Sequence, residues 1–350
     1  MNQLICNMAK ILLRDGRWIG DYEQPYIVAE VNSSHNGDIE VAKKMIEAAA
    51  EAGCDCVKFQ SWSAESLYSA TYYNANPISK RIVKKFSLTK EELREMAEYS
   101  RSKGVDFSST PYSRDEVDWL IDECKAPFVK VASMDLNNYA YLKYIAEKQV
   151  PIVLSTGMSE LEEIRKAVYV IESTGNHQLC LLHCISIYPP EIETIHLNNI
   201  LGLREEFPAY PIGFSDHSHG VEMAVAATAL GAALIEKHLT LDRTKIGMDN
   251  QMATEPEEMR LMVQGCHNTQ SAMGQKERLV REAEQEQIKK MRRSVIVNRD
   301  MKAGEVLRLE DLDAKRPGTG IPADRLETLV GKVLRVDKEA DTLLLEGEIE

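Results

Sequence analysis

Short apolar or β-branched runs alternate along this chain with longer stretches in which apolar residues recur at spacings of three and four. Eight such runs occur, at residues 26–29, 54–59, 105–108, 128–132, 152–154, 179–183, 211–214 and 233–235. Strands that alternate with helices pair in parallel through crossover helices. Eight strand–helix units in about 250 residues match the size of a (β/α)8 barrel. A doubly wound open sheet is the alternative, but no glycine-rich dinucleotide fingerprint favours it.

The stretches between the runs predict helices. Helical spacing occurs at residues 39–52, 90–103, 114–124, 139–148, 161–173 and 221–230. Ser113 is a predicted N-cap, and Ser159 with Glu162 forms a capping-box pattern. Three stretches are followed by a glycine where a left-handed C-cap is favourable, namely Gly53, Gly104 and Gly231.

The C-terminal part of the chain differs in character from the rest. Residues 276–293 are dense in Glu, Gln, Lys and Arg, which predicts a partly helical linker. Residues 294–350 show short strands separated by turns. We therefore predict an α/β protein with a (β/α)8 TIM barrel at residues 1–275, a linker at 276–293 and a small β-rich domain at 294–350.

Charge and cysteine content limit the partners and the compartment. The 350 residues carry a formal net charge of −13, which repels nucleic acid and anionic lipid and argues against both as partners. A phosphate-bearing substrate would therefore need a local basic pocket. Seven cysteines without a disulfide framework indicate a reducing compartment. Residues 1–20 lack a signal-peptide pattern, and no run is long enough to span a membrane, so we expect a cytoplasmic protein.

Polar residues stand where each predicted strand ends. In a (β/α)8 barrel the active site lies at the carboxyl ends of the strands, so these residues are candidates for one site. They are Glu30, Lys58, Gln60, Ser109, Thr110, Lys130, Ser133, Ser155, Thr156, His183, Ser186, Ser215, Asp216, His217, Glu236, Lys237 and His238.

Two histidines at neighbouring strand ends suggest a metal site. Residues two apart in a strand share a face, so Ser215 points with His217 and Glu236 points with His238. Two imidazoles beside a carboxylate can bind a divalent ion such as Mn²⁺, although the sequence does not choose the metal. A lone histidine would more simply satisfy hydrogen bonds in the core, but the pair favours the metal interpretation.

Two lysines inside apolar runs suggest an anion pocket. An unpaired ammonium is costly in such a run, yet Lys58 and Lys130 both stand at strand ends among Ser and Thr hydroxyls. Lysine binds phosphate as a point charge, and hydroxyls donate hydrogen bonds to it. Glu30 faces the same end of the barrel as a base, a metal ligand or a structural ion-pair partner of Lys58, and the residues alone do not decide between these roles.

Taken together, the ordered segments resemble the sialic acid (N-acetylneuraminate) synthase family. In the tail, residues 315–321 and 329–332 resemble the antifreeze-like (SAF) domain of that family. The similarity runs from about residue 25 to the end of the chain. The matching stretches of the barrel are residues 29–30, 35–37, 57–60, 109–111, 130–133, 154–158, 182–184, 188–189, 213–218, 230–232 and 236–238.

The resemblance implies an activity. Family members condense phosphoenolpyruvate with an open-chain amino sugar, form a C–C bond and release phosphate. It therefore implies a transferase that uses a divalent metal ion, Mn²⁺ or Mg²⁺, and acts on an N-acylated amino sugar such as N-acetylmannosamine or a bacterial diacetamido relative. It also implies a homodimer whose tail domains cross over to the partner's active site.

The same resemblance implies roles for individual residues. His217 and His238 correspond to metal ligands. Glu30, Asp249 and Glu236 correspond to catalytic or supporting carboxylates. Arg316 corresponds to a tail-domain arginine that reaches the sugar bound in the partner subunit. The positions that correspond to substrate-binding residues of the barrel are Lys58, Gln60, Thr110, Lys130, Ser133, Ser155, Ser186, Tyr188 and Ser215.

Four positions depart from the family pattern. Ser34 stands where Asn often precedes the histidine, and residues 247–250, which commonly read Gly-Pro-Asp-His, have Met248 and Asn250 at the second and fourth positions. The position of Ser186 is Asn in some members. We expect these departures to lie near the sugar rather than the phosphate, so they leave the sugar's identity open. Synthesis of another sugar acid, including one from a phosphorylated sugar, and a non-catalytic carbohydrate-binding role are the alternatives.

Overall fold

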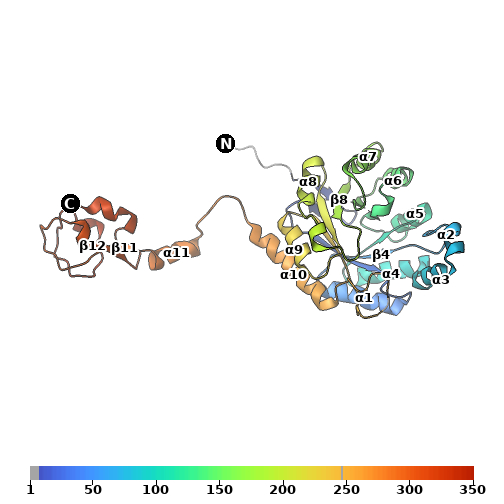
Figure 1. The fold of residues 1–350 in the computed structure, drawn as a ribbon, viewed down its shortest axis with the longest axis horizontal. Coiled ribbons are helices and arrows are strands. Elements are labelled where there is room, and N and C mark those ends of the chain that lie inside the picture. The colour runs from blue at the N-terminus through green and yellow to red at the C-terminus, as the bar shows by residue number, and fades with distance from the viewer. Residues whose placement is uncertain (1–7, 246) are drawn as a thin grey trace. The chain divides into compact units, whose positions relative to one another are not determined.

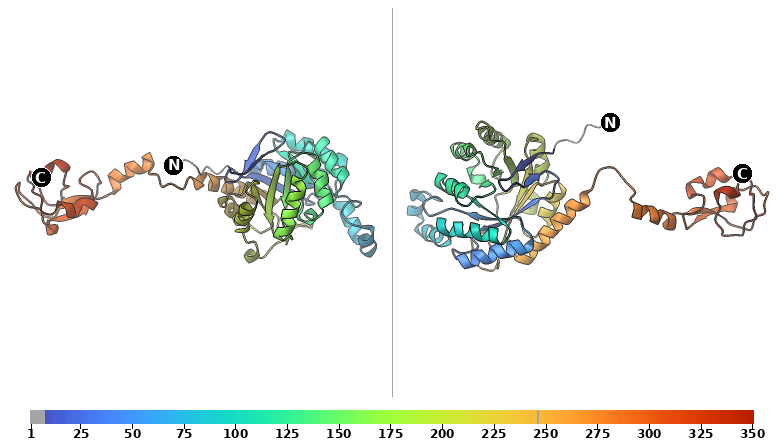
Figure 2. Two further views of the ribbon diagram at one scale, coloured as in Figure 1. Left: turned by 90° about the horizontal axis from the view of Figure 1, so that it is seen from above. Right: turned by 180° about the vertical axis from the view of Figure 1, so that it is seen from behind.

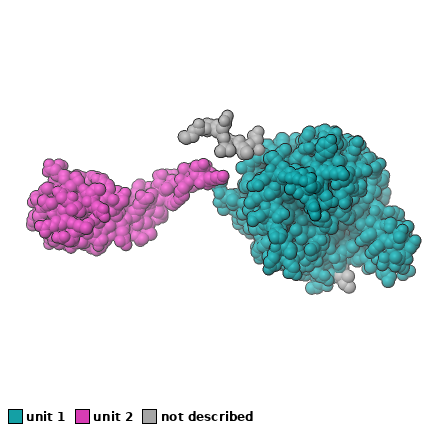
Figure 3. Space-filling view, turned by 45° about the horizontal axis from the view of Figure 1, so that its top comes forward, with its two compact units in different colours: residues 1–274 teal, residues 275–350 magenta. Residues whose placement is uncertain are grey.

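A computed structural model of the chain describes residues 8–245 and 247–350 (Figure 1). The chain forms two compact units, of which the first ends at Gly274 and the second spans Gln275–Glu350 (Figure 3). Each unit has a hydrophobic core of its own. Cys6 and the first part of the segment in which we looked for a signal peptide lie outside the described residues.

Eight parallel strands form a nearly closed barrel in the first unit (Figure 1). Their order is β5-β4-β3-β10-β9-β8-β7-β6, and β5 adjoins β6 where Ser108 Oγ donates to the Phe128 carbonyl at 3.0 Å. The (β/α)8 prediction is therefore confirmed. The strands are β3 (Tyr26–Asn32), β4 (Cys56–Gln60), β5 (Asp106–Thr110), β6 (Val129–Val131), β7 (Ile152–Ser155), β8 (Leu179–Cys184), β9 (Ile212–Asp216) and β10 (Leu234–His238).

Helices surround this barrel, as the front view (Figure 1) and the view from behind (Figure 2, right) both show. Two of them, α2 (Ala70–Ala75) and α3 (Pro77–Phe86), form an excursion between β4 and α4. Short 3-10 turns at Ser133–Asp135 and Ile192–Thr194 follow β6 and β8. The other helices of the barrel are α1 (Ile39–Ala52), α4 (Lys90–Ser102), α5 (Arg114–Asp122), α6 (Tyr139–Glu147), α7 (Leu161–Glu172), α8 (Asn199–Glu206), α9 (Glu222–Ala229) and α10 (Pro256–Met273).

Most of the predicted helix termini match the structure. Ser113 Oγ accepts the Glu116 N–H at 3.2 Å, as an N-cap should. Gly53 caps α1 with φ of 85°, a left-handed conformation that glycine adopts without strain. The Ser159 capping box is wrong by one residue, because the Ser159 hydroxyl donates to the Gly157 carbonyl instead. The Glu163 carboxylate accepts the N–H of Glu160, and α7 begins at the next residue.

A hairpin of β1 (Lys10–Leu12) and β2 (Trp18–Gly20) supplies side chains to the barrel interior. Its Ile11, Leu13 and Ile19 are at most 2 % exposed. They belong to one cluster with residues from the bodies of the barrel strands, upstream of the polar strand ends. The barrel members of this cluster are Tyr26, Val28, Cys56, Phe128, Val153, Cys180, Leu182 and Leu234. The hairpin therefore fills the end of the barrel opposite the predicted active site. We did not predict this hairpin from the sequence.

The second unit contains a helix and a small β-rich fold. Helix α11 (Glu282–Met291) precedes an antiparallel pair, β11 (Ser294–Val297) and β12 (Leu312–Lys315). Short 3-10 turns lie at Leu309–Asp311, Ala323–Leu329 and Glu346–Glu348. A core of ten buried apolar residues confirms the predicted β-rich domain: Val295, Val297, Met301, Leu307, Leu312, Ile321, Leu329, Leu334, Leu344 and Ile349.

The helices give no indication of a membrane segment. None that the structure describes combines the length and the apolar composition needed to traverse a bilayer.

The hairpin's contribution to stability can be measured. Ile11 is 1 % exposed and its neighbour Leu12 is 38 % exposed, so the two form a matched pair. We expect Ile11→Ala to lower the free energy of unfolding by about 2–5 kcal/mol, because it leaves a cavity in the closed end of the barrel. Leu12→Ala should cost less than about 1 kcal/mol. Urea unfolding followed by circular dichroism measures both free energies. Equal effects of the two substitutions would contradict the inference that the hairpin fills this end of the barrel.

Candidate active site

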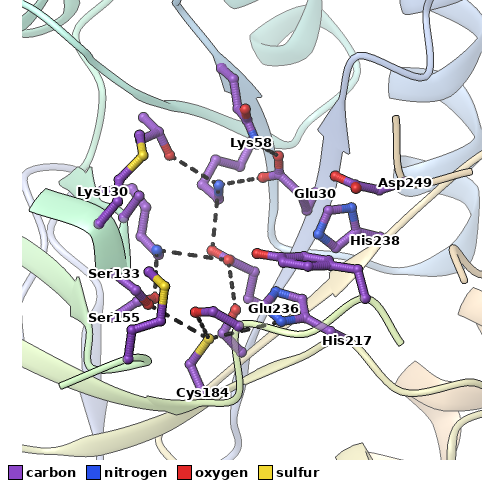
Figure 4. Close-up of a pocket in the computed structure, with 18 of the residues that line it drawn as sticks. Glu30, Lys58, Lys130, Ser133, Ser155, Cys184, His217, Glu236, His238 and Asp249 are labelled. Atoms are coloured by element: carbon purple, nitrogen blue, oxygen red, sulfur yellow. Dashed lines mark hydrogen bonds and ion pairs between the residues drawn. The ribbon is translucent and has the colours of Figure 1, made fainter. Parts of the chain in front are cut away.

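A cavity of about 300 Å³ opens at the carboxyl ends of the barrel strands (Figure 4). Every barrel residue that we predicted to be catalytic, substrate-binding or metal-ligating lines it: Glu30, Lys58, Gln60, Thr110, Lys130, Ser133, Ser155, Ser186, Tyr188, Ser215, His217, Glu236, His238 and Asp249. Sequence reasoning missed five further lining residues: Tyr112, Ala132, Met134, Met158 and Cys184. Arg316 lies in the second unit and is exposed.

Strand register explains why these side chains converge. Glu30 pairs with Lys58 across β3 and β4, and with His238 across β3 and β10. Glu236 pairs with Ser215 across β9 and β10. Because successive residues of a strand face opposite sides, polar residues two apart share a face, and here that face points into the mouth of the barrel.

Four buried charges form an ion-pair network at the floor of the cavity. Lys58 Nζ contacts Glu30 Oε2 and lies 3.7 Å from Glu236 Oε2, and Lys130 Nζ lies 3.8 Å from Glu236 Oε1 (Figure 4). Gln60 Nε2 donates to Glu30 Oε1 at 3.0 Å. None of the four charged residues is more than 5 % exposed. Of the roles left open for Glu30, the ion pair with Lys58 is therefore present, and the two lysines are matched by two carboxylates.

The network shifts the ionisation of its members in different directions. Burial lowers the pKa of Lys58, but Glu236 and Glu30 outweigh it and the pKa is raised. Burial, aided by repulsion from Lys58, lowers the pKa of Lys130 despite the attraction of Glu236. Burial likewise raises the pKa of Glu30 despite Lys58. Lys130 is thus the less compensated cation, so an arriving anion gains most beside it.

Hydroxyl groups surround the two ammonium groups. Lys130 Nζ donates to Ser155 Oγ at 2.7 Å, and Lys58 Nζ donates to Thr110 Oγ1 at 3.2 Å. Gly157 lets this part of the cavity close tightly, because a Cβ there would lie 2.3 Å from Ser186 Oγ and 2.8 Å from Ser133 Oγ. Cations with hydroxyl donors around a small concave space form an arrangement that binds a phosphate or carboxylate group.

The two predicted metal ligands face each other on the opposite side of the cavity. The ring centroids of His217 and His238 are 5.4 Å apart, and the Tyr188 ring lies 4.1 Å from that of His217. His217 Nδ1 is 2.8 Å from the Ile185 carbonyl, which leaves Nε2 as the ligating nitrogen. Burial lowers the pKa of His238 well below its usual value and keeps its imidazole neutral. Neutral imidazole is the form that binds a metal.

The carboxylate that we expected beside the histidines has another partner. Glu236 faces the two lysines and accepts a hydrogen bond from Ser215 Oγ at 3.0 Å. Among the described residues, no group of three or more His, Cys, Asp or Glu side chains is arranged to hold a metal ion. The donors present are the two imidazoles of His217 and His238, which would suit a divalent ion whose remaining ligands are water or substrate oxygens.

Sequence reasoning also missed an ion pair on the outer face of the same strands. Lys237 Nζ donates to Asp216 Oδ2 at 2.8 Å and to the Ser218 carbonyl at 2.5 Å. Lys237 and Asp216 are each 1 % exposed. They occupy the positions between the cavity-lining residues, so this pair joins β9 to β10 beside both histidines. The signal was available, since strand alternation places residues 216 and 237 together on the outer face.

The buried ion pair between Lys237 and Asp216 leads to a prediction about stability. Lys237→Met should lower the free energy of unfolding by about 3–5 kcal/mol, because it leaves the Asp216 carboxylate buried and unpaired. A Lys237→Met/Asp216→Leu double variant should recover much of that loss, since it removes both charges. Thermal and urea unfolding of both variants would show this, and a double variant no more stable than the single one would contradict it.

Fold and site together define a (β/α)8 barrel whose cavity carries two lysines with hydroxyl groups on one side and two imidazoles on the other. Residues 45–278 match the NeuB family, and residues 292–350 match the SAF domain. The chain therefore belongs to the NeuB family and carries a C-terminal SAF domain. Such proteins are condensing transferases that form a C–C bond with phosphoenolpyruvate, and the chain is an enzyme of this class.

Similarity to individual proteins extends over most of the chain. It is 36 % identical to the N,N'-diacetyllegionaminic acid synthase of Campylobacter jejuni, over 91 % of this chain and 98 % of that protein. It is 33 % identical to the human N-acetylneuraminate-9-phosphate synthase, over 95 % of this chain and 94 % of that protein. A crystal structure of the N-acetylneuraminic acid synthetase of Leptospira borgpetersenii superposes with a TM-score of 0.73 at 32 % identity, covering 80 % of this chain and 95 % of that one.

Proposed function

We propose that this enzyme condenses phosphoenolpyruvate with the open-chain aldehyde of an N-acylated amino sugar to give a sialic-acid-type nonulosonate and inorganic phosphate. N-acetylmannosamine and bacterial diacetamido sugars are the candidate acceptors. The observation that carries the proposal is the single cavity in which a lysine–hydroxyl cradle faces two imidazoles. The names of the relatives support the same chemistry, since they are synthases of legionaminic acid and of N-acetylneuraminate 9-phosphate.

Phosphoenolpyruvate fits the lysine side of the cavity. Its phosphoryl and carboxylate groups would take over contacts that Glu30 and Glu236 now make with Lys58 and Lys130. Ser155 and Thr110 already bond the two ammonium groups and are placed to donate to phosphate or carboxylate oxygens. This arrangement holds the enol carbon toward the histidine side, where the aldehyde would lie.

The chemical step then needs few protein groups. When bound to His217 and His238, a divalent ion, Mn²⁺ or Mg²⁺, would supply Lewis-acid polarisation of the aldehyde oxygen. The enol carbon of phosphoenolpyruvate bonds to the aldehyde carbon, and water adds to the cationic centre at the phosphate-bearing carbon. Glu30 is the group to accept the proton of that water, because its burial raises its pKa toward the range of an effective base. The hydroxyl proton of the resulting tetrahedral centre passes to the alkoxide formed from the aldehyde oxygen as the C–O bond to phosphate breaks, which releases phosphate and leaves the keto acid.

The acceptor is proposed to be unphosphorylated. A sugar phosphate would need a second cationic group for its far end. Among the described residues that line the cavity, Lys58 and Lys130 are the only lysines, there is no arginine, and carboxylates pair with both lysines.

We expect purified protein with Mn²⁺ and phosphoenolpyruvate to release phosphate only when N-acetylmannosamine or a diacetamido hexosamine is added. Absence of phosphate release with the whole panel of sugars and metals would overturn the proposal.

The lysine cradle can be tested separately from the sugar side. Lys130→Met should raise KM for phosphoenolpyruvate by at least about 100-fold, because a buried charge-assisted contact to the phosphate or carboxylate is lost. Lys143→Met is the matched control, since Lys143 is exposed and its ion pair with Glu147 is 4.0 Å long. Steady-state phosphate release measures both variants. An unchanged KM in the Lys130 variant would place phosphoenolpyruvate elsewhere.

We further propose a homodimer in which Arg316 of each tail completes the partner's site. Chains carrying Lys130→Met and chains carrying Arg316→Ala should each turn over poorly on the acylated sugar. If the tails cross over, a hybrid dimer of the two variants contains one site with a wild-type barrel and a wild-type arginine. Activity should therefore return when the two variants are unfolded, mixed and refolded together. Without crossover every hybrid site keeps one defect, and no activity would return.

A further inference from the structure

The loop that carries Asp249 is fastened by side chains that lie outside the cavity. This loop, of which the structure describes residues 239–245 and 247–255, joins β10 to α10. Asn32 Nδ2 donates to Asp249 Oδ2, and Ser34 Oγ donates to Asn250 Oδ1 at 2.5 Å. Asn32, Ser34 and Asn250 are 4 %, 7 % and 1 % exposed, and none of them lines the cavity that Asp249 lines. We call these three residues the latch.

Asn250 is fixed at both ends of its amide. Its Oδ1 accepts from Ser34, and its Nδ2 donates to the Lys245 carbonyl at 3.2 Å. Gly247 approaches the same amide so closely that a Cβ there would lie 2.6 Å from Asn250 Cγ. The buried Asn250 side chain therefore bonds both to another residue of its own loop and to Ser34, just after β3. A buried amide with both ends bonded loses more than one contact when it is removed.

Asn32 reaches Asp249 from a constrained backbone. Its φ is +47°, in the left-handed region that costs most side chains energy and that Asn tolerates best among non-glycine residues. The register of β3 against β4 shifts between Glu30 and Asn32, which marks a bulge at the end of the strand. The bulge turns Asn32 toward the Asp249 carboxylate while Glu30 keeps its place in the ion-pair network.

Two of the positions that depart from the family pattern thus contact each other. We expected both to lie near the sugar rather than the phosphate. Neither lines the cavity, and Ser34 Oγ donates to Asn250 Oδ1, so the two form one buried feature rather than two separate changes. Their contact determines where the next residue, Asp249, is held.

We propose that the latch residues are positioning residues: they hold the Asp249 carboxylate at the cavity, on the acceptor side, without touching substrate themselves. Asp249 lines the cavity, and its carboxylate accepts a hydrogen bond from the Asn32 amide, which does not line the cavity. Losing the latch should therefore affect the sugar and the catalytic step, but not the binding of phosphoenolpyruvate by Lys58 and Lys130. The inference rests on the proposed condensation for its kinetic readout only.

The test compares variants that remove single latch contacts. Asn32→Gly removes the amide while suiting the positive φ, and Ser34→Ala removes the hydroxyl. Each should lower kcat by at least about tenfold while KM for phosphoenolpyruvate stays unchanged, because a buried hydrogen bond that orients a carboxylate is lost. Ser34→Thr keeps a hydroxyl and should restore much of the loss. Lys125→Gly is the control, because Lys125 also has a positive φ, of 55°, is exposed, and forms no hydrogen bond with Asp249 or with the latch.

A second measurement does not depend on turnover. Amide hydrogen exchange of residues 239–255 should be faster in Asn32→Gly and Ser34→Ala than in wild type, with the rest of the barrel unchanged. The proposal is overturned by wild-type kcat in both variants, by an equal loss in Lys125→Gly, or by unchanged exchange in the loop. If wild type releases no phosphate with any sugar, the proposed function fails. Faster exchange in the variants then still supports the latch, and unchanged exchange overturns it.

Discussion

The site depends on four charges that are buried together at the barrel mouth. Taking a single ammonium or carboxylate out of water costs several kcal/mol, so none of them would be stable there alone. Glu30 and Glu236 compensate Lys58 and Lys130, and the folded protein thereby keeps two cations in place for an anionic substrate. In the reaction that we propose, an incoming phosphate would compete with the carboxylates for the lysines. Glu30, whose pKa is raised by burial, is the carboxylate that we propose as the base.

Strand alternation assigns different tasks to the two faces of β9 and β10. Inward positions carry the hydroxyl, carboxylate and imidazole groups of the cavity. Outward positions carry Asp216 and Lys237, whose ion pair joins the two strands at the level of the histidines. This pair supports the strands that carry the imidazoles from the face opposite the cavity. The metal site that we propose would need such support, because two ligands alone do not constrain an ion strongly.

Loops complete what the strands begin. The β1–β2 hairpin fills one end of the barrel with apolar side chains, so the polar cavity is confined to the other end. There the β10–α10 loop brings Asp249 over the cavity from a point in the chain far from Glu30. Residues at the end of β3 hold it by hydrogen bonds rather than by apolar packing. Directional bonds of this kind fix a carboxylate more narrowly than packing does.

The sequence by itself determined the barrel and the residues at its mouth. Both follow from local rules: the strand period of two and the convergence of parallel strand ends place Lys58, Lys130, His217 and His238 in one cavity whatever the detailed packing. The sequence could not decide which partner each of these groups would have. Glu236, which we expected to accompany the histidines, forms its ion pairs with the lysines, and Ser34 does not line the cavity but is buried and bonded to Asn250. Those choices depend on inter-strand register, a bulge and a long loop, which arise from contacts between residues distant in the chain, so only the tertiary structure could make them.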